Sequence, residues 1–449
     1  MTAAAKSVSQ SGQAGPEIHP EPVSTQRRGL RSITGQSAIL FSGFAAAQFL
    51  SFARNAFIGH WLSRGDFGIA ASITLTLQLC ETLSDMGADR LIVQSDDGDK
   101  PDLIGSAQTF LIARGIATAM LLYVLAGPMT GFFGIPDARW AFEAIAVIPL
   151  LKGFLNLDMR RRQRQLDNAP YIAGEVVPQA IALAATIPVL MLTPDFGAVL
   201  WIALLQAIAA VATSHLVSQR PYALGFNRVY FSRLWHFGWP ICLSALPLIA
   251  VYQGDRMIIG RLFGMEALAG YTAAFMITMV PGLVAAKVGH ALMLPLMAEK
   301  KTDPAGFTTR VLGLGITTCV ASLVYILGFA LLGGLAVEWV FGANYAGLGG
   351  LVLALALMWS LRMIQAVPGM ALIAVGETRP LLYAGLIRAS ALGLAFAAAV
   401  QGYGVVGVAL AGTVGELASL TYVVWVMLRK CPIHLEAATL PSFATAWRS

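Results

Sequence analysis

The chain has 449 residues, of which 57% are hydrophobic and only 12% are charged, and its mean hydropathy is +0.69. Soluble domains carry about 25% charged residues, so this composition excludes an ordinary soluble protein and indicates a chain embedded in lipid. The formal net charge of +6 reflects basic residues in loops beside membrane spans, and gives no reason to expect a nucleic-acid partner.

Hydropathy predicts twelve membrane spans between two polar tails. Residues 1–35 are expected to form a flexible cytoplasmic tail, and residues 429–449 a second one. A bilayer core of about 30 Å needs roughly 20 helical residues per span. Windows of that length lie near 36–61, 67–93, 104–127, 138–160, 168–192, 196–218, 233–256, 267–297, 309–334, 346–374, 380–401 and 404–428.

The positions of the basic residues predict the orientation of these spans. Of the 30 Lys and Arg residues, eight fall within spans: Arg54, Arg90, Arg114, Lys152, Arg256, Lys287, Arg362 and Arg388. With the N-terminus inside, only Arg64, Arg139 and Arg261 face outward, and the remaining 19 face the cytoplasm. Because Lys and Arg are retained on the cytoplasmic side, both termini are expected there.

Two stretches about two hundred residues apart look like copies of one another. They are Arg54–Ala71 (RNAFIGHWLSRGDFGIAA) and Asp255–Ala273 (DRMIIGRLFGMEALAGYTA), and each joins two apolar spans across a short turn. Six spans per half is an even number, so the repeat is parallel, with a pseudo-twofold axis along the membrane normal. The predicted fold is an all-α membrane protein with six-helix bundles at 36–218 and 233–428, a cytoplasmic linker at 219–232, and a binding cleft between the bundles.

Several segments resemble bacterial polysaccharide-transporter flippases. The first hairpin reads ARNAFIGHWLSRGDFGIAASITLTLQLCETLSDMGADRLIVQ, and the second half contains HFGWPICLSALPLIAVYQGDRMIIGRLFGMEALAGYTAAF. MLPLMAEKKTDPAGF and AVGETRP are similar to later segments of the same family. The resemblance implies the fold of the superfamily that also contains multidrug-and-toxin exporters and lipid II flippases. It further implies transport of undecaprenyl-diphosphate-linked oligosaccharide across the bacterial inner membrane, with a polymerase and glycosyltransferases of the pathway as potential partners.

Ionisable residues inside the spans supply the candidate site, since charges in lipid normally face protein or a wet cavity. The candidate substrate-binding cations, which could grip a diphosphate, are Arg54, Arg114, Lys152, Lys287, Arg362 and Arg388. Glu81, Asp85 and Asp255 are the candidate ion-coupling acids. Thr74, Gln78, Glu81 and Asp85 share one helix face, and Glu81 is expected to pair with Arg114. Alternatively, these charges are paired struts that hold the bundle together.

No catalytic, metal or cofactor site is predicted. Cys80, Cys242, Cys319 and Cys431 lack CxxC or Cys/His spacing, and no GxxxxGK[ST] motif occurs. Asp97-Gly98-Asp99 spells a DxD, but it lies in a short acidic loop and is interpreted as solvated. A drug or metabolite exporter of the same fold is the alternative to a flippase. A membrane polymerase or ligase is disfavoured, because every outer loop is short.

Overall fold

The computed structural model describes residues 23–300, 303–431 and 433, with side chains described for all of these except 23–38, 284–292 and 295. Within this part the chain is helical and contains no β-strand. The first half comprises α1 (Val23–Trp61), α2 (Arg64–Ser84), α3 (Ala88–Gln94), α4 (Pro101–Phe133), η1 (Pro136–Ala138), α5 (Arg139–Ala144), α6 (Val147–Lys152), α7 (Asp158–Arg164), α8 (Ala169–Leu192) and α9 (Gly197–Leu216). The second half comprises α10 (Arg228–Phe263), α11 (Met265–Glu299), α12 (Pro304–Phe341), η2 (Ala343–Tyr345), α13 (Gly349–Ala374), α14 (Arg379–Val400) and α15 (Gly404–Lys430).

Nine helices among the described residues are long and apolar enough to cross a membrane, which makes this a multi-pass membrane protein. They are α2, α4, α8, α9, α10, α12, α13, α14 and α15. The long helices α1 and α11 coincide with the predicted first and eighth spans.

The predicted fourth span, 138–160, was wrong as a continuous helix. The chain there forms η1 and the short helices α5, α6 and α7. Pro149 explains the break between α5 and α6, because it cannot donate to the Ile145 carbonyl four residues earlier and its ring clashes with that carbonyl. Gly153 ends α6 and lets it pack closely on α4, where a Cβ on Gly115 would lie 3.2 Å from the Gly153 Cα.

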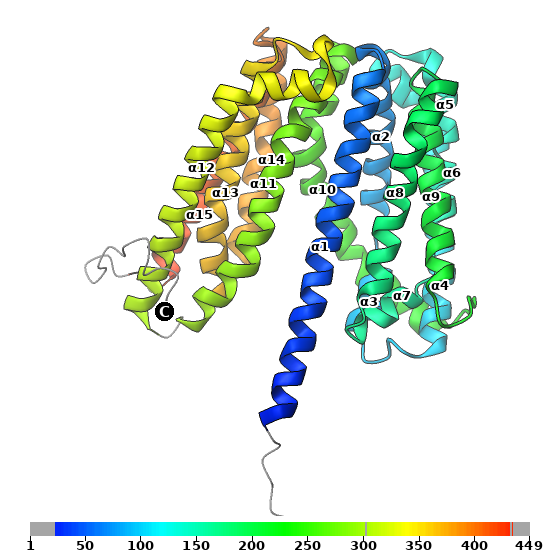
Figure 1. Ribbon diagram of the computed structural model, residues 1–449, viewed down its shortest axis with the longest axis vertical. Coiled ribbons are helices and arrows are strands. Elements are labelled where there is room, and N and C mark those ends of the chain that lie inside the picture. Colours follow the sequence, from blue (N-terminus) through cyan, green and yellow to red (C-terminus); the bar gives the residue numbers. More distant parts are fainter. Residues whose placement is uncertain (1–22, 301–302, 432, 434–449) are drawn as a thin grey trace, which may run out of the picture.

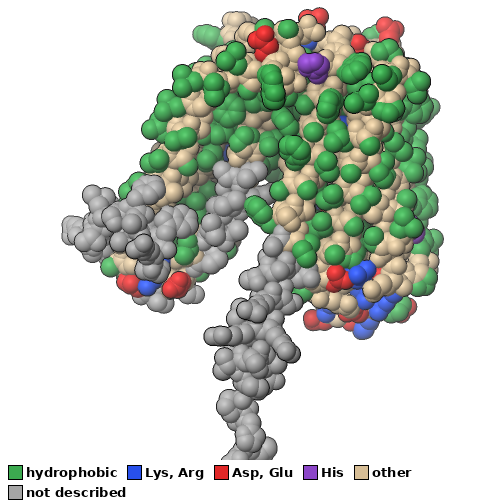
Figure 2. Space-filling model, viewed as in Figure 1, with side chains coloured by type: hydrophobic (Ala, Val, Ile, Leu, Met, Phe, Trp, Pro, Cys, Tyr) green, Lys and Arg blue, Asp and Glu red, His purple; other side chains and the backbone are tan. Residues whose placement is uncertain are grey.

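The helices are arranged in two groups that lean apart toward one end of the molecule (Figure 1). At the upper end in this view lie the α1–α2 turn, the α10–α11 turn and η2, and we call this the hairpin end. At the lower end lie α3, α7 and the start of α10, and we call this the basic end. Figure 2 shows Lys and Arg side chains gathered at the basic end of the first half, below a wide apolar belt.

The largest described apolar cluster lies at the hairpin end and joins the two halves. Phe67 of α2 packs against Phe341 and Tyr345 of the second half, with ring centroids 6.1 Å and 6.3 Å apart. Arg64 fastens the same contact, because its guanidinium donates to the Glu266 carbonyl at 3.3 Å and to the Asn344 carbonyl at 3.4 Å. The halves are therefore closed against each other at this end.

The duplicated hairpins make matching contacts within this closure. A Cβ on Gly59 would lie 2.5 Å from the Phe341 ring, and a Cβ on Gly260 would lie 2.8 Å from the Phe133 ring. Phe133 and Phe341 each end a helix, α4 and α12, directly before a glycine. Each half thus places its terminal phenylalanine on the Ile-Gly glycine of the other half. We call these two contacts the hairpin-end seal.

Helix α10 packs against both halves. Near the basic end, Leu234 is buried with α3 and α4, and a Cβ on Gly238 would lie 2.4 Å from Met86. Farther along, a Cβ on Gly254 would lie 2.6 Å from Leu392 of α14. Pro240 and Pro247 lie inside the helix between these contacts. Prolines remain compatible with a membrane helix where its neighbours satisfy the freed backbone groups.

A charge network organises the basic end. The carboxylate of Asp158 accepts from the Arg161 guanidinium at 2.6 Å, and both side chains are buried. Arg161 and Arg164 also lie 3.7 Å from Asp99.

The acidic loop takes part in this network rather than being merely solvated. The hydrogen bond from Lys100 holds the pKa of Asp97 below its ordinary value. Arg233, at the start of α10, reaches the same carboxylate at 3.5 Å. These pairs give the DxD a structural role in the described chain.

Candidate substrate cavity

A cavity of about 320 Å³ lies inside the first half, below the hairpin-end seal. Side chains of α1, α2, α6, α8 and α9 line it, and α10 and α11 contribute Arg256, Thr272 and Met276. Its polar uncharged lining is rich in amides and hydroxyls: Ser51, Asn55, Thr74, Gln78, Gln179, Gln206 and Thr272. These groups can donate to and accept from a polyhydroxylated ligand.

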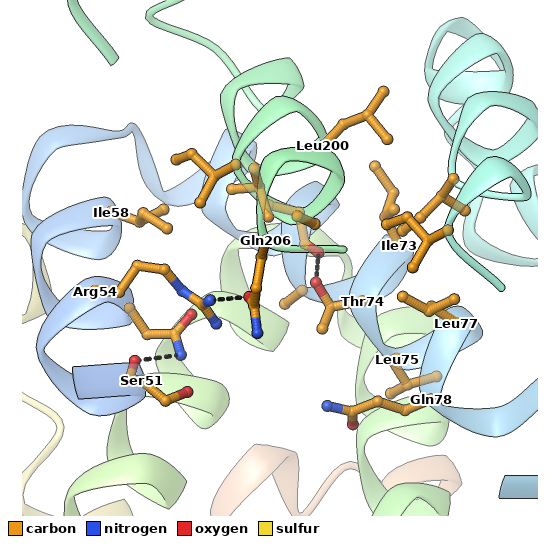
Figure 3. A pocket seen from close by; sticks show the side chains of 18 of the residues that line it. Ser51, Arg54, Ile58, Ile73, Thr74, Leu75, Leu77, Gln78, Leu200 and Gln206 are labelled. Carbon is orange, nitrogen blue, oxygen red and sulfur yellow. Dashed lines mark hydrogen bonds between the residues drawn. The ribbon is translucent and has the colours of Figure 1, made fainter. Parts of the chain in front are cut away.

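Arg54 points into this cavity from α1 (Figure 3). Its guanidinium donates to the side-chain oxygen of Gln179 at 3.1 Å and to that of Gln206. No carboxylate lies within ion-pair distance of Arg54 among the residues that the structure describes. Glutamine oxygens satisfy hydrogen-bond donors but do not neutralise charge, so Arg54 provides an uncompensated cation to the cavity.

Three of the four residues of the polar face predicted for α2 line the cavity, namely Thr74, Gln78 and Glu81. Asp85 follows the end of the helix and pairs with Arg90 and Arg114 instead. The partner predicted for Glu81 was wrong. Its carboxylate accepts from the Lys152 ammonium at 2.7 Å and 3.1 Å, whereas Arg114 reaches only the Glu81 backbone carbonyl, at 3.2 Å. The sequence predicts that Glu81 and Arg114 lie at similar depths in the membrane. However, Lys152 approaches Glu81 from α6, on the side of α2 that faces the cavity.

Arg114 lies in an adjoining recess of about 190 Å³, which shares Glu81 and Lys152 with the cavity. The Arg114 guanidinium donates to the Ser84 hydroxyl at 3.3 Å and lies 3.7 Å from the Asp85 carboxylate. Asp85 also accepts from Arg90 at 2.9 Å, so one carboxylate serves two cations. The recess therefore has a local surplus of positive charge.

Arg256 is a cavity residue that sequence reasoning passed over. It lies in the second hairpin copy, where it aligns with Asn55, one position after the residue that aligns with Arg54. Its guanidinium sits 4.3 Å from the Phe275 ring centroid and donates to Gln253 at 3.3 Å. With Arg54 and Lys152 it makes three cations against one carboxylate, Glu81, and gives the cavity lining a formal charge of +2.

The remaining predicted site residues lie elsewhere. Arg362 donates to Glu416 at 2.5 Å and Arg388 lies 3.9 Å from the same carboxylate, in a small separate cavity of the second half. Asp255 lines that cavity too and accepts a hydrogen bond from the Tyr271 hydroxyl. The side chain of Lys287 lies outside the described residues. In the described part, no three His, Cys, Asp or Glu side chains group closely enough to hold a metal ion.

A model of the polysaccharide biosynthesis protein family matches residues 60–349. The chain belongs to this family. TuaB, a teichuronic acid biosynthesis protein of Bacillus subtilis, is 22% identical over 319 residues, which cover 71% of this chain and 66% of TuaB. A Shigella flexneri protein named as a candidate O-antigen transporter is 23% identical over 434 residues, which cover 90% of this chain and 99% of its own.

Solved structures share the fold. The lipid II flippase MurJ, in an inward closed conformation, superposes with a TM-score of 0.72 at 13% identity, covering 89% of each chain. An inward-facing multidrug resistance transporter of the MATE family gives 0.68 at 13% identity, covering 85% of this chain and 94% of its own. These findings confirm the family resemblance and the all-helical membrane fold. They agree with the expected non-enzymatic role in membrane transport for polysaccharide biosynthesis.

Proposed function

We propose that this family member is a flippase that carries undecaprenyl-diphosphate-linked oligosaccharide across the bacterial inner membrane by alternating access. The product would feed exopolysaccharide, O-antigen or capsule synthesis. The observation that carries the proposal is Arg54, a cation without a carboxylate partner in the described chain, set in a cavity of amides and hydroxyls. An anion that bears many hydroxyl groups complements such a lining.

The physical need for this lining follows from the cost of crossing lipid. Each sugar hydroxyl costs roughly 2–7 kcal/mol to bury without a hydrogen bond, and a diphosphate costs far more. The polar cavity replaces water around the hydroxyls, while Arg54, Lys152 and Arg256 offer positive charge to the anionic head group as it passes through. The same formal charge of +2 disfavours the cationic substrates expected of a drug exporter.

The proposed topology keeps twelve spans in two six-helix bundles. The described helices supply all of them if α2 and α3 form the second span and η1 with α5 and α6 forms the fourth. The basic end then faces the cytoplasm, as the excess of Lys and Arg there requires. Reporter fusions after Arg164 and Lys301 should report cytoplasm and one after Gly134 the outer side, and any reversal would refute this topology.

In that orientation the hairpin-end seal closes the outer side, and the described conformation is open toward the cytoplasm. The seal and the Arg64 contacts hold the two halves together above the cavity. Figure 2 shows the halves separating below this contact. A head group would enter from the cytoplasm and leave once the seal opened and the basic end closed.

The deciding experiment measures flipping in proteoliposomes with a fluorescent lipid-linked oligosaccharide, scored by chemical quenching of the label in the outer leaflet. Arg54→Gln should lower the rate about 10-fold or more, because charge-assisted hydrogen bonds contribute about 1.5–3 kcal/mol each. Arg54→Lys should retain part of the activity. Arg139→Gln, at an exposed position outside the cavity, is the matched control.

Two outcomes would contradict the proposal. Flipping by Arg54→Gln at the wild-type rate would remove Arg54 from the transport step. Export of organic cations by a wild-type protein that leaves the lipid-linked oligosaccharide in place would assign the drug-exporter function instead.

A further inference from the structure

An apolar hollow adjoins the recess that holds Arg114. It is a groove of about 420 Å³ at the seam between α4 and α10. The groove shares Ser84, Arg114 and Thr118 with the recess, and the recess shares Glu81 and Lys152 with the polar cavity. The polar cavity, the recess and the groove therefore adjoin one another in a series from polar to apolar, and Arg114 lies between the recess and the groove.

Two helix faces form the walls of the groove. On α4 they are Phe110, Ala113, Ala117 and Leu121, whose spacing puts them on one face. At 1.5 Å per residue this wall is about 16 Å long. On α10 the wall contains Trp235, Trp239 and Cys242, again on one face.

The groove lies on the outer surface of the helix bundle, where membrane lipid would surround it. Trp235 and Trp239 are 51% and 52% exposed, and Ala113 and Ala117 are exposed as well. Because their side chains are small, the two alanines leave a depression on the surface of α4 between the bulkier Phe110 and Leu121. A flexible hydrocarbon chain could therefore enter sideways from the bilayer without crossing the polar cavity.

We propose that this groove holds the hydrocarbon tail of the transported lipid, with the anionic diphosphate at Arg114 and the sugars in the polar cavity. The inference rests on the proposed flippase function and adds the site and orientation of the tail. Charge complementarity selects this occupant over a neutral lipid, because Arg114 and Arg90 share the single carboxylate of Asp85. Position supports it too, since Arg114 is the charged member of the three residues that border both the apolar groove and the recess leading to the sugars.

Photo-crosslinking of the whole protein in nanodiscs tests the assignment. The probe is a polyprenyl diphosphate with a diazirine in its isoprenoid chain, and labelled peptides are identified by mass spectrometry. We expect label within 110–121 and 231–242, removed by excess polyprenyl diphosphate but not by phosphatidylethanolamine. Polyprenol, which lacks the phosphates, should compete at least 10-fold less well.

Two substitutions at exposed alanines make the test specific. Ala117→Phe fills the groove and should reduce labelling at least 10-fold, whereas Ala397→Phe on α14 should leave it unchanged. Both variants should reach the membrane at wild-type levels, because neither side chain is packed in the core. Arg114→Gln should abolish the advantage of the diphosphate over polyprenol, and Arg114→Lys should restore part of it.

Three results would overturn the assignment. They are label confined to other helices, label in the groove that phosphatidylethanolamine removes equally well, and label that Ala117→Phe leaves intact. In each case a wild-type protein that still flips the lipid-linked oligosaccharide refutes only the tail site. A wild-type protein that flips nothing and binds no probe refutes the flippase proposal itself.

Discussion

Gly59→Ala should weaken the hairpin-end seal and shift the protein toward an outward-open state. The added Cβ would lie 2.5 Å from Phe341 Cδ1, so the ring would have to move by about 1 Å to reach ordinary contact. Phe341 is only 1% exposed and packs against Phe67 and Tyr345, so the ring has no free space. Overpacking of this kind costs about 1–3 kcal/mol, which corresponds to about a 5- to 150-fold change in the equilibrium between sealed and open states.

Distances between spin labels at the hairpin end measure this shift. Asp137→Cys and Ala343→Cys, in η1 and η2, place one exposed label on each half in a background without the four native cysteines. Gly59→Ala should increase the population of long distances between the labels. Gly328→Ala on α12 is the matched control, because a Cβ there would meet nothing within 4 Å.

A double substitution separates overpacking from a general loss of folding. Phe341→Ala removes the ring that the new methyl group would strike, so adding Gly59→Ala to it should have no further effect on the distances. An unchanged distance distribution in Gly59→Ala, at normal protein levels, would refute the argument. Equal widening by Gly328→Ala would refute it as well.

Three further predictions concern the charges. Lys152→Gln should weaken binding of the anionic substrate, whereas Glu81→Gln should strengthen it, and a binding titration that shows the same direction for both would contradict the assigned cavity charge. Asp158→Asn replaces the close carboxylate partner of buried Arg161 and leaves only Asp99, 3.7 Å away. The lost charge-assisted hydrogen bond should cost about 1.5–3 kcal/mol, seen as a lower thermal unfolding midpoint in detergent, and an unchanged midpoint would be inconsistent with a stabilising pair. If protonation or cation binding at Asp255 couples transport to an ion gradient, Asp255→Asn should remove the dependence of flipping on a proton or sodium gradient, and a wild-type rate that ignores both gradients would exclude coupling.

Much of the architecture was predictable because hydropathy and repetition report directly on helices in lipid. The duplicated Ile-Gly at Gly59 and Gly260 marked the hairpins, and the structure brings both to the same end of the molecule. The break in the fourth span was missed because a window of average hydropathy does not register a single proline such as Pro149. The backbone chemistry of one proline determined where this helix breaks, whereas the composition of the segment is apolar throughout and gives no sign of the break.

The sequence indicated how deep in the membrane each site residue lies, but not toward which neighbouring helix its side chain points. Arg54, Glu81 and Lys152 were selected as interior charges and do line one cavity. The prediction that Arg114 pairs with Glu81 was wrong because the sequence indicates only the position of a residue along its helix. An ion pair also depends on which neighbouring helix the side chain faces. Arg256 was counted within a span but not as a site residue, because the family resemblance in this segment lies in the preceding residue, Asp255.

Helix α10 packs against both halves, and this bears on how the halves can move during a transport cycle. Its first turns are packed on α3 and α4, and its later turns lie against α14. A rigid rod fixed to both halves would stop them from tilting past one another. Pro240 and Pro247 leave the carbonyls of His236 and Leu243 without their usual helical donors, so bending is cheapest between those attachments. We therefore expect α10 to act as a hinge that bends over 240–247, while the other helices move as rigid bodies.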